Sequence, residues 1–186
     1  AARLGRGGTQ QRRHEDAGAV CAWCGRAGSS TTEAGVWGDD ARECRSRASW
    51  GGDAGVINGD KWVITDARGA ACAVVFAITD PEAGPHRRAS MFIVESDTPG
   101  YEFVREVPVM GDQSEGGHCE LRFVNCRVPA ENMLGERGGG FSLAQARLGP
   151  GRITHCMRWI GVAQRAFELM LARASQRGTR GPQLAA

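Results

Sequence analysis

The feature that most constrains the fold of this chain is a series of short apolar segments between residues 54 and 128. Each segment is rich in β-branched and aromatic residues and is bounded by Gly, Pro, Asn or Asp, which is typical of β-strands separated by turns. Strands are expected at residues 55–57, 61–65, 71–78, 90–94, 101–110 and 118–128. This pattern predicts an antiparallel β-sandwich or β-barrel.

Asn58 and Gly59 separate the first two of these segments. Both residue types readily adopt a positive φ, which a type I′ turn requires at its two central positions. We therefore expect residues 55–57 and 61–65 to form a β-hairpin around this pair.

A different periodicity begins near Gly140. From Ile153 to Ala174, apolar residues recur every three or four positions, which predicts a long amphipathic helix over residues 140–177. Such a helix usually packs in a bundle or at a subunit interface. The expected fold class is therefore α+β, with an antiparallel β-domain followed by one long helix of an incomplete bundle.

Residues 1–50 follow neither period and are rich in Gly, Arg, Ser and Ala. They offer little apolar burial to offset the entropy of ordering, so we expect residues 1–31 to be irregular or disordered. Residues 32–137 are then expected to form the β-domain, and residues 138–186 to begin a helical domain. Within the β-domain, residues 32–53 are expected to be degraded, because the segment 43–50 lacks apolar alternation.

The charges are nearly balanced, with 23 Lys and Arg against 21 Asp and Glu. No basic stretch contains interleaved aromatic residues, so composition gives no support for a nucleic-acid partner. No apolar segment approaches the roughly 18 residues of a membrane span, and the N-terminal residues lack the apolar core of a signal peptide. We expect a protein that is not secreted and has no membrane span.

The seven cysteines are irregularly spaced, which favours a reducing compartment. Cys21 and Cys24 could form half of a zinc site, with His14 and Cys44 as remote ligands. No second close pair completes the usual zinc spacing, so a zinc-binding module is only an alternative interpretation.

Arg152 follows Pro150 and Gly151 near the expected start of the long helix. A helix N-terminus binds anions through its free N–H groups, and an arginine adds a fork that fits phosphate. This segment therefore predicts a site for a large anionic ligand, with a solvated arginine as the alternative. The glycines at 138–140 lack the spacing of a dinucleotide-binding loop, and we expect a flexible lead into the helix.

Two further groups of residues are candidate sites. Trp62 and Thr65 could contact a flat cofactor, although a regular strand places them on opposite faces. The four histidines do not cluster in the sequence. Glu120 shares the strand face of His118, and a surface pair of these two residues is the expected arrangement.

Several longer motifs lie between Gly55 and Arg177. They are Val56-Ile57-Asn58-Gly59-Asp60-Lys61-Trp62, Asp97-Thr98-Pro99-Gly100, Gly116-Gly117-His118, Val128-Pro129-Ala130-Glu131-Asn132, Gly140-Phe141, Arg147-Leu148-Gly149-Pro150-Gly151-Arg152-Ile153 and His155-Cys156-Met157-Arg158. In content and order this set resembles the acyl-CoA dehydrogenase family, especially the branch that includes family members 10 and 11.

The resemblance implies an enzyme with an N-terminal helical domain, a middle β-domain and a C-terminal four-helix domain. Such enzymes bind FAD and oxidise the Cα–Cβ bond of an acyl-CoA thioester. The resemblance also implies an electron-transfer flavoprotein or similar acceptor, a homo-oligomer, and a location in the bacterial cytoplasm or the mitochondrial matrix. By the same resemblance, this chain contains the middle domain and the first C-terminal helix.

Individual residues can be carried over from the family motifs. Thr32 resembles the threonine of a Thr-Glu-Pro motif at the flavin. Ile64 and Thr65 match residues of the strand that lies against the flavin, and Arg152 matches the arginine that reaches the nucleotide end of CoA. Residues that bind the FAD pyrophosphate of a neighbouring subunit correspond to Arg177 and Thr179.

The sequence departs from the family pattern in three places. Ala34 replaces the proline of the Thr-Glu-Pro motif, and Val63 replaces a tryptophan in the flavin strand. Asp40 keeps the spacing of the Ser-Asp pair that follows, but Asp39 stands where the serine is expected. A carboxylate at that position is expected to repel pyrophosphate.

The family's catalytic base is expected beyond Ala186, so no catalytic residue and no metal ligand are assigned in this chain. Two interpretations stay open. The chain is part of an FAD-dependent acyl-CoA dehydrogenase, or it is a truncated, catalytically inactive relative that acts at most as a weak binding or interaction module. We expect that the chain alone does not retain stoichiometric FAD.

Overall fold

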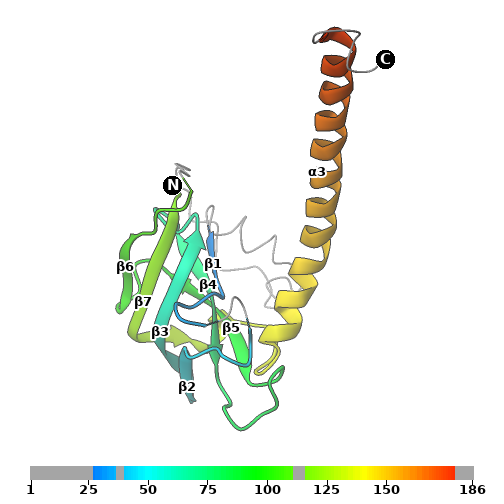
Figure 1. Cartoon of the computed structure of the whole chain (residues 1–186). Helices are drawn as coiled ribbons and strands as arrows, with labels where there is room; N and C mark the ends of the chain where they lie inside the picture. The colour runs from blue at the N-terminus through cyan, green and yellow to red at the C-terminus, as the bar shows by residue number, and fades with distance from the viewer. Residues whose placement is uncertain (1–26, 37–39, 111–115, 179–186) are drawn as a thin grey trace, which may run out of the picture. The chain divides into compact units, whose positions relative to one another are not determined.

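A computed structural model describes residues 27–36, 40–110 and 116–178 of the chain (Figure 1). The elements in this range are β1 (Ala27–Ser30), β2 (Arg47–Gly51), β3 (Ala54–Thr65), β4 (Cys72–Ile78), β5 (Ala89–Glu95), β6 (Tyr101–Glu106), β7 (His118–Pro129), η1 (Ala130–Asn132), β8 (Met133–Leu134) and α3 (Gly140–Gln176). The chain divides into two compact units between Ala144 and Gln145.

The strands form one eight-stranded sheet with the order β6-β7-β3-β2-β4-β5-β8, and β1 pairs with β4. The β4 strand pairs in parallel with β1 and β2, and all other pairs are antiparallel. The predicted class, a mostly antiparallel β-domain followed by one long helix, is confirmed.

The core lies on both faces of the β4–β5 ribbon. Val75 and Phe92 point into one buried cluster, which also contains side chains from β2, β3 and β7. Their neighbours Phe76 and Ile93 point into a second cluster, which the start of α3 covers with Phe141 and other side chains. Burial of each large apolar side chain contributes roughly 1.5–3 kcal/mol, so the two-sided burial of β4 and β5 makes them the centre of the domain.

The predicted hairpin around Asn58 and Gly59 is wrong, because β3 runs without a turn from Ala54 to Thr65. Asn58 instead uses its side-chain oxygen to accept a hydrogen bond of 2.7 Å from the backbone N–H of Asn125 on β7. Gly59 is required by space, since a Cβ atom there would lie 2.3 Å from Oγ of Ser46. The Asn-Gly pair therefore marks close strand packing instead of a turn.

Two β-bulges interrupt the pairing of β3 with β7. The register passes from Ile57↔Cys126 to Gly59↔Phe123, which leaves one extra residue in β7, where Asn125 has a φ of 49°. It passes later from Lys61↔Leu121 to Ile64↔Cys119, which leaves one extra residue in β3. Both strands have 12 residues, and their ends still align at Ala54↔Pro129 and Thr65↔His118.

The sheet begins earlier than the sequence suggested. The β1 strand, Ala27–Ser30, lies within the segment predicted to be irregular. The β2 strand, Arg47–Gly51, forms where apolar alternation was thought to be lost. Alanine and tryptophan supply that alternation, because Ala48 is buried and Trp50 packs on the same core cluster.

The predicted helix over residues 140–177 is confirmed as α3, which contains Pro150 in its interior. The glycines before it are a tight joint instead of a flexible lead. A Cβ atom at Gly138 would lie 2.4 Å from the carbonyl oxygen of Arg87, and one at Gly140 would lie 2.9 Å from that of Ala89. The backbone N–H of Gly138 also donates to Oγ of Ser90 on β5.

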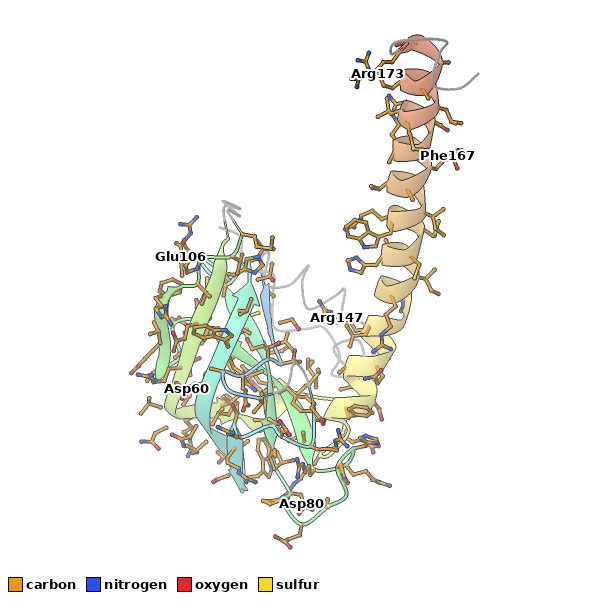
Figure 2. The ribbon with its side chains drawn as sticks, viewed as in Figure 1. Asp60, Asp80, Glu106, Arg147, Phe167 and Arg173 are labelled. Atoms are coloured by element: carbon orange, nitrogen blue, oxygen red, sulfur yellow. The ribbon has the colours of Figure 1, made fainter. Side chains whose placement is uncertain are left out.

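Large apolar side chains are exposed along α3. Those more than half exposed include Ile153, Met157, Trp159, Ile160 and Phe167, the last of which is labelled in Figure 2. None of the helices in the described residues is both long and apolar enough to cross a membrane.

Candidate functional site

A buried carboxylate anchors the segment after β1. Oε1 of Glu33 accepts hydrogen bonds from Nζ of Lys61 at 2.8 Å, the backbone N–H of Ser46 at 3.0 Å and Sγ of Cys44 at 3.2 Å. Oε2 accepts one from the backbone N–H of Arg45 at 2.7 Å. Four donors on one carboxylate hold residues 31–36 and 44–46 against β3.

Charge explains the titration of this cluster. Burial disfavours the ionised form of Glu33, but the charge and hydrogen bond of Lys61 outweigh it and lower the pKa of the carboxyl to about 2. Burial, aided by the nearby Glu33 carboxylate, raises the pKa of the Cys44 thiol to about 11. The cluster therefore holds an ion pair and a protonated thiol at neutral pH.

The anchored segment places Thr32 beside β3. The backbone N–H of Trp62 donates to the carbonyl oxygen of Thr32 at 2.9 Å, and both residues are half-buried. Thr32 is thereby joined to β3, the strand that also contains Ile64 and Thr65.

The bulge in β3 decides which side chains of this strand face outward. Lys61 and Ile64 are both buried although three positions separate them, because Val63 adopts a φ of 57° at the extra residue. The side chain of Ile64 packs in the core, so this predicted cofactor residue offers only its main chain to a ligand. Thr65 is exposed.

The hydroxyl of Thr65 meets a histidine on the neighbouring strand. Thr65 pairs directly with His118, and Oγ1 lies 3.1 Å from Nδ1 of the ring. Glu120, the expected partner of His118, accepts a hydrogen bond of 2.8 Å from Arg105. The guanidinium of Arg105 lies 5.0 Å from the ring centroid of Trp62, so Trp62 and Thr65 border the same outer side of the sheet.

Ion pairs continue along these strands. Arg68 contacts Glu106 at 2.5 Å and Arg122 contacts Asp60 at 2.7 Å; both carboxylates are labelled in Figure 2. These pairs are about half exposed and contribute little to stability, about 0–1 kcal/mol each.

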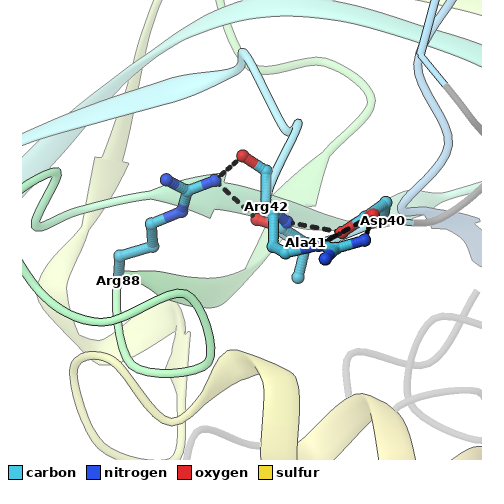
Figure 3. A network of polar contacts seen from close by, with 4 residues as sticks. All are labelled: Asp40, Ala41, Arg42 and Arg88. Carbon is cyan, nitrogen blue, oxygen red and sulfur yellow. Dashed lines mark hydrogen bonds and ion pairs between the residues drawn. The ribbon is translucent and has the colours of Figure 1, made fainter.

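Asp40 belongs to a separate network near the second core cluster (Figure 3). Its carboxylate accepts hydrogen bonds from Nε of Arg42 at 2.9 Å and from the Arg42 backbone N–H at 2.9 Å. These bonds lower the pKa of Asp40 to about 2. Arg88 closes the network by donating to the carbonyl oxygens of Ala41 and Arg42. Asp39 lies outside the described residues.

Arg152 does not lie at a helix N-terminus, because α3 begins at Gly140 and continues through Pro150. The helix-end argument for anion binding at this position is therefore wrong. Arg152 is exposed and donates to the side-chain oxygen of Gln145 at 3.1 Å. Arg177 is exposed just after the last residue of α3, and Thr179 lies outside the described residues.

No group of three or more possible metal ligands occurs in the part of the chain that the structure describes. Cys44, proposed as a remote zinc ligand, is a buried thiol that donates a hydrogen bond to Glu33. His14, Cys21 and Cys24 lie outside the described ranges.

Sequence reasoning missed Glu33 as an anchor, Lys61 as its partner and His118 as a partner of Thr65. The available signal for Lys61 was a charged residue at an inward position of a strand whose other buried residues are Ala, Gly and Ile. The available signal for His118 was its position beside the paired glycines of a family motif.

Comparison with known proteins identifies the family of this chain. The profile for the acyl-CoA dehydrogenase middle domain matches residues 28–126, and that for the C-terminal domain matches residues 138–186. The chain belongs to the acyl-CoA dehydrogenase family. The middle-domain match begins within β1, four residues before the boundary expected at Thr32.

Relatives within the family cover most of this chain. It is 47% identical to the probable acyl-CoA dehydrogenase FadE2 of Mycobacterium tuberculosis over 86% of its length, and spans 40% of that protein. It is 44% identical to acyl-CoA dehydrogenase family member 11 of Mus musculus over 78% of its length, and spans 19% of that protein.

Solved structures of the same family have the same fold. A putative acyl-CoA dehydrogenase from Mycobacterium abscessus aligns with a TM-score of 0.75 and 39% identity, over 86% of this chain and 40% of that one. Butyryl-CoA dehydrogenase from Megasphaera elsdenii aligns with a TM-score of 0.70 and 33% identity, over 86% of this chain and 41% of that one.

Proposed function

We propose that this chain supplies one wall of an FAD site in a protein that oxidises an acyl-CoA thioester between Cα and Cβ. Family membership supports the reaction class. The observation that carries the proposal is the backbone hydrogen bond from Trp62 to Thr32, at 2.9 Å, which joins the two motif segments assigned to the flavin.

The residues at this position suit a flavin. An isoalloxazine ring presents nitrogen and oxygen atoms at its edge, and Thr65 offers an exposed hydroxyl that a second strand holds in place. Thr32 lies half-buried beside Trp62, and Ile64 contributes main-chain groups. The four hydrogen bonds to Glu33 fix the Thr32 segment, which limits the ordering entropy lost when a ligand binds.

The reaction is a two-electron oxidation of the thioester. The substrate loses its α-proton to a carboxylate and a hydride from Cβ, and a Cα=Cβ double bond forms. Bound FAD would accept the hydride. This chain is assigned the positioning of the cofactor, and no residue in it is assigned as the base.

Other parts of the proposal concern the helical region. Arg152 is assigned to the nucleotide end of CoA, where a guanidinium suits phosphate. Arg177 and Thr179 are assigned to the FAD pyrophosphate of a neighbouring copy in a homo-oligomer. The exposed apolar side chains of α3 favour such an assembly, since patches of this kind usually mark interfaces.

The proposed electron acceptor is an electron-transfer flavoprotein. An electron transferring flavoprotein structure of Acidaminococcus fermentans aligns with a TM-score of 0.69 and 33% identity over 86% of this chain and 41% of that one. The reaction belongs to fatty acid oxidation in this proposal, and its location is the bacterial cytoplasm or the mitochondrial matrix.

The test is titration of the chain with FAD, in which the quenching of flavin fluorescence measures binding. We expect saturable binding that is too weak for the purified chain to retain stoichiometric FAD. Thr65→Val should weaken it by about fivefold, because one hydrogen bond contributes about 1 kcal/mol. Thr98→Val, in the turn after β5, is the matched control and should bind as the wild type does. Absence of saturable FAD binding by the wild-type chain would overturn the proposal.

A further inference from the structure

The pairing of Thr65 with His118 is reinforced by backbone contacts just beyond it. The backbone N–H of Asp66 donates to the carbonyl oxygen of Gly117 at 2.9 Å, and that of Arg68 donates to Gly116 at 3.0 Å. These bonds extend the β3–β7 ladder beyond its last paired residues. They hold the backbone of His118 opposite Thr65.

The two glycines before His118 are required for this approach. A Cβ atom at Gly116 would lie 2.5 Å from Cα of Asp66, and Gly117 has a φ of 59°. A larger residue at Gly116 would push β7 away from the segment after β3, and one at Gly117 would have to adopt an unfavourable positive φ. The two glycines of the Gly116-Gly117-His118 motif therefore allow the close approach beside which the His118 ring contacts the Thr65 hydroxyl.

A threonine hydroxyl has one proton and can also accept hydrogen bonds. If Nδ1 of His118 is unprotonated, the hydroxyl donates to it and turns its lone pairs toward any other partner. If Nδ1 carries a proton, the hydroxyl accepts from it and its own proton is free to be donated elsewhere. The histidine therefore decides whether Thr65 is a donor or an acceptor toward a ligand.

We propose that His118 is a positioning residue that sets the hydrogen-bonding direction of the Thr65 hydroxyl toward bound flavin. This inference rests on the proposed FAD site. Its chemical consequence is specific to redox state, because a ring nitrogen that accepts a hydrogen bond in oxidised flavin carries a proton in reduced flavin. A hydroxyl that is held as a donor, or as an acceptor, toward that nitrogen must favour either the oxidised or the reduced flavin.

The experiment compares the affinity of each variant for oxidised FAD and for chemically reduced FAD under anaerobic conditions. The ratio of the two affinities gives the shift in reduction potential on binding. We expect Thr65→Val and His118→Leu each to change this ratio by about tenfold, because each removes or reverses one hydrogen bond between the Thr65 hydroxyl and the flavin. A tenfold change corresponds to about 30 mV for a two-electron couple.

Three further variants separate positioning from packing. His118→Asn should keep the wild-type ratio, because the asparagine amide reaches the position of Nδ1, whereas His118→Gln should behave as His118→Leu does. The double variant Thr65→Val/His118→Leu should match Thr65→Val alone. His86→Asn, in the loop before β5, is the control and should leave the ratio unchanged.

The outcomes are distinguishable. Failure of the wild-type chain to bind either form of FAD overturns both the proposed function and this inference. Binding with a ratio that responds to Thr65→Val but not to His118→Leu overturns the inference alone. Equal ratios for His118→Asn, His118→Gln and His118→Leu also overturn it, because the ring then acts only through its size.

Discussion

Nζ of Lys61 lies 2.8 Å from Oε1 of Glu33, and the lysine side chain is completely buried. Burying two charges is costly, and it is tolerated here because the carboxylate accepts three further hydrogen bonds. The pair joins the segment after β1 to the middle of β3. It thereby fixes the place where the two proposed flavin segments meet.

The first prediction concerns the strength of this pair. Lys61→Met leaves the Glu33 carboxylate buried without its counter-charge and should lower the free energy of unfolding by about 3–5 kcal/mol. Urea denaturation measures this change. Asp60→Asn removes one partner of an exposed pair and should cost about 0–1 kcal/mol. Equal losses for the two variants would contradict the assigned importance of the buried pair.

The second prediction is a pH dependence. Glu33 has a pKa of about 2 in the folded chain, against an ordinary value of 4.5. Because the folded value is depressed, its stabilisation is complete above the unfolded value and is lost as the pH falls from about 4.5 toward 2. The stability difference between wild type and Glu33→Gln should therefore be constant near neutral pH and shrink in acid. Parallel stability curves down to the lowest pH would refute this.

A third prediction concerns thiol reactivity. The pKa of Cys44 is raised to about 11, so its thiolate fraction at neutral pH should be about a hundredfold below that of an ordinary thiol. Iodoacetamide should label the exposed Cys156 in the folded chain and label Cys44 only after unfolding. Peptide mass spectrometry follows both sites in one sample, and comparable labelling rates under native conditions would count against the buried cluster.

A fourth prediction tests the packing of β3. Gly59→Ala places a methyl group 2.7 Å from Cα of Ser46 at a φ of 151°, and should cost about 3 kcal/mol through overpacking and backbone strain. Gly84→Ala has open space around it and should change stability by less than about 0.5 kcal/mol. Thermal unfolding of the two variants compares them, and a Gly59→Ala protein as stable as Gly84→Ala would show that the strand is not packed this closely.

The strands at the centre of the domain could be predicted because their apolar pattern depends only on local sequence. Residues 71–78 and 90–94 are apolar on both faces, and the structure buries both faces. Asn58-Gly59 was misinterpreted because its partners, Asn125 and Ser46, lie far from it in the sequence. An Asn-Gly pair that packs closely against distant strands has the same local sequence as one that forms a turn.

The site could be predicted only through family motifs. Thr32 and Thr65 were identified in that way, whereas Glu33, Lys61 and His118 depend on contacts across 28 or more residues. Arg152 was expected near the start of the long helix because it follows Pro150 and Gly151. α3 begins at Gly140 and contains Pro150, so Arg152 lies inside the helix instead.

Because of the paired bulges in β3 and β7, the residue that lies opposite Thr65 depends on the number of residues in each strand. One extra residue on each strand cancels the other, so the strand ends align only when both are present. A one-residue deletion in either strand would shift the ends by one position, and a matching deletion in the other would restore them. Insertions and deletions in these two segments should therefore be inherited in pairs, even where substitutions accumulate freely.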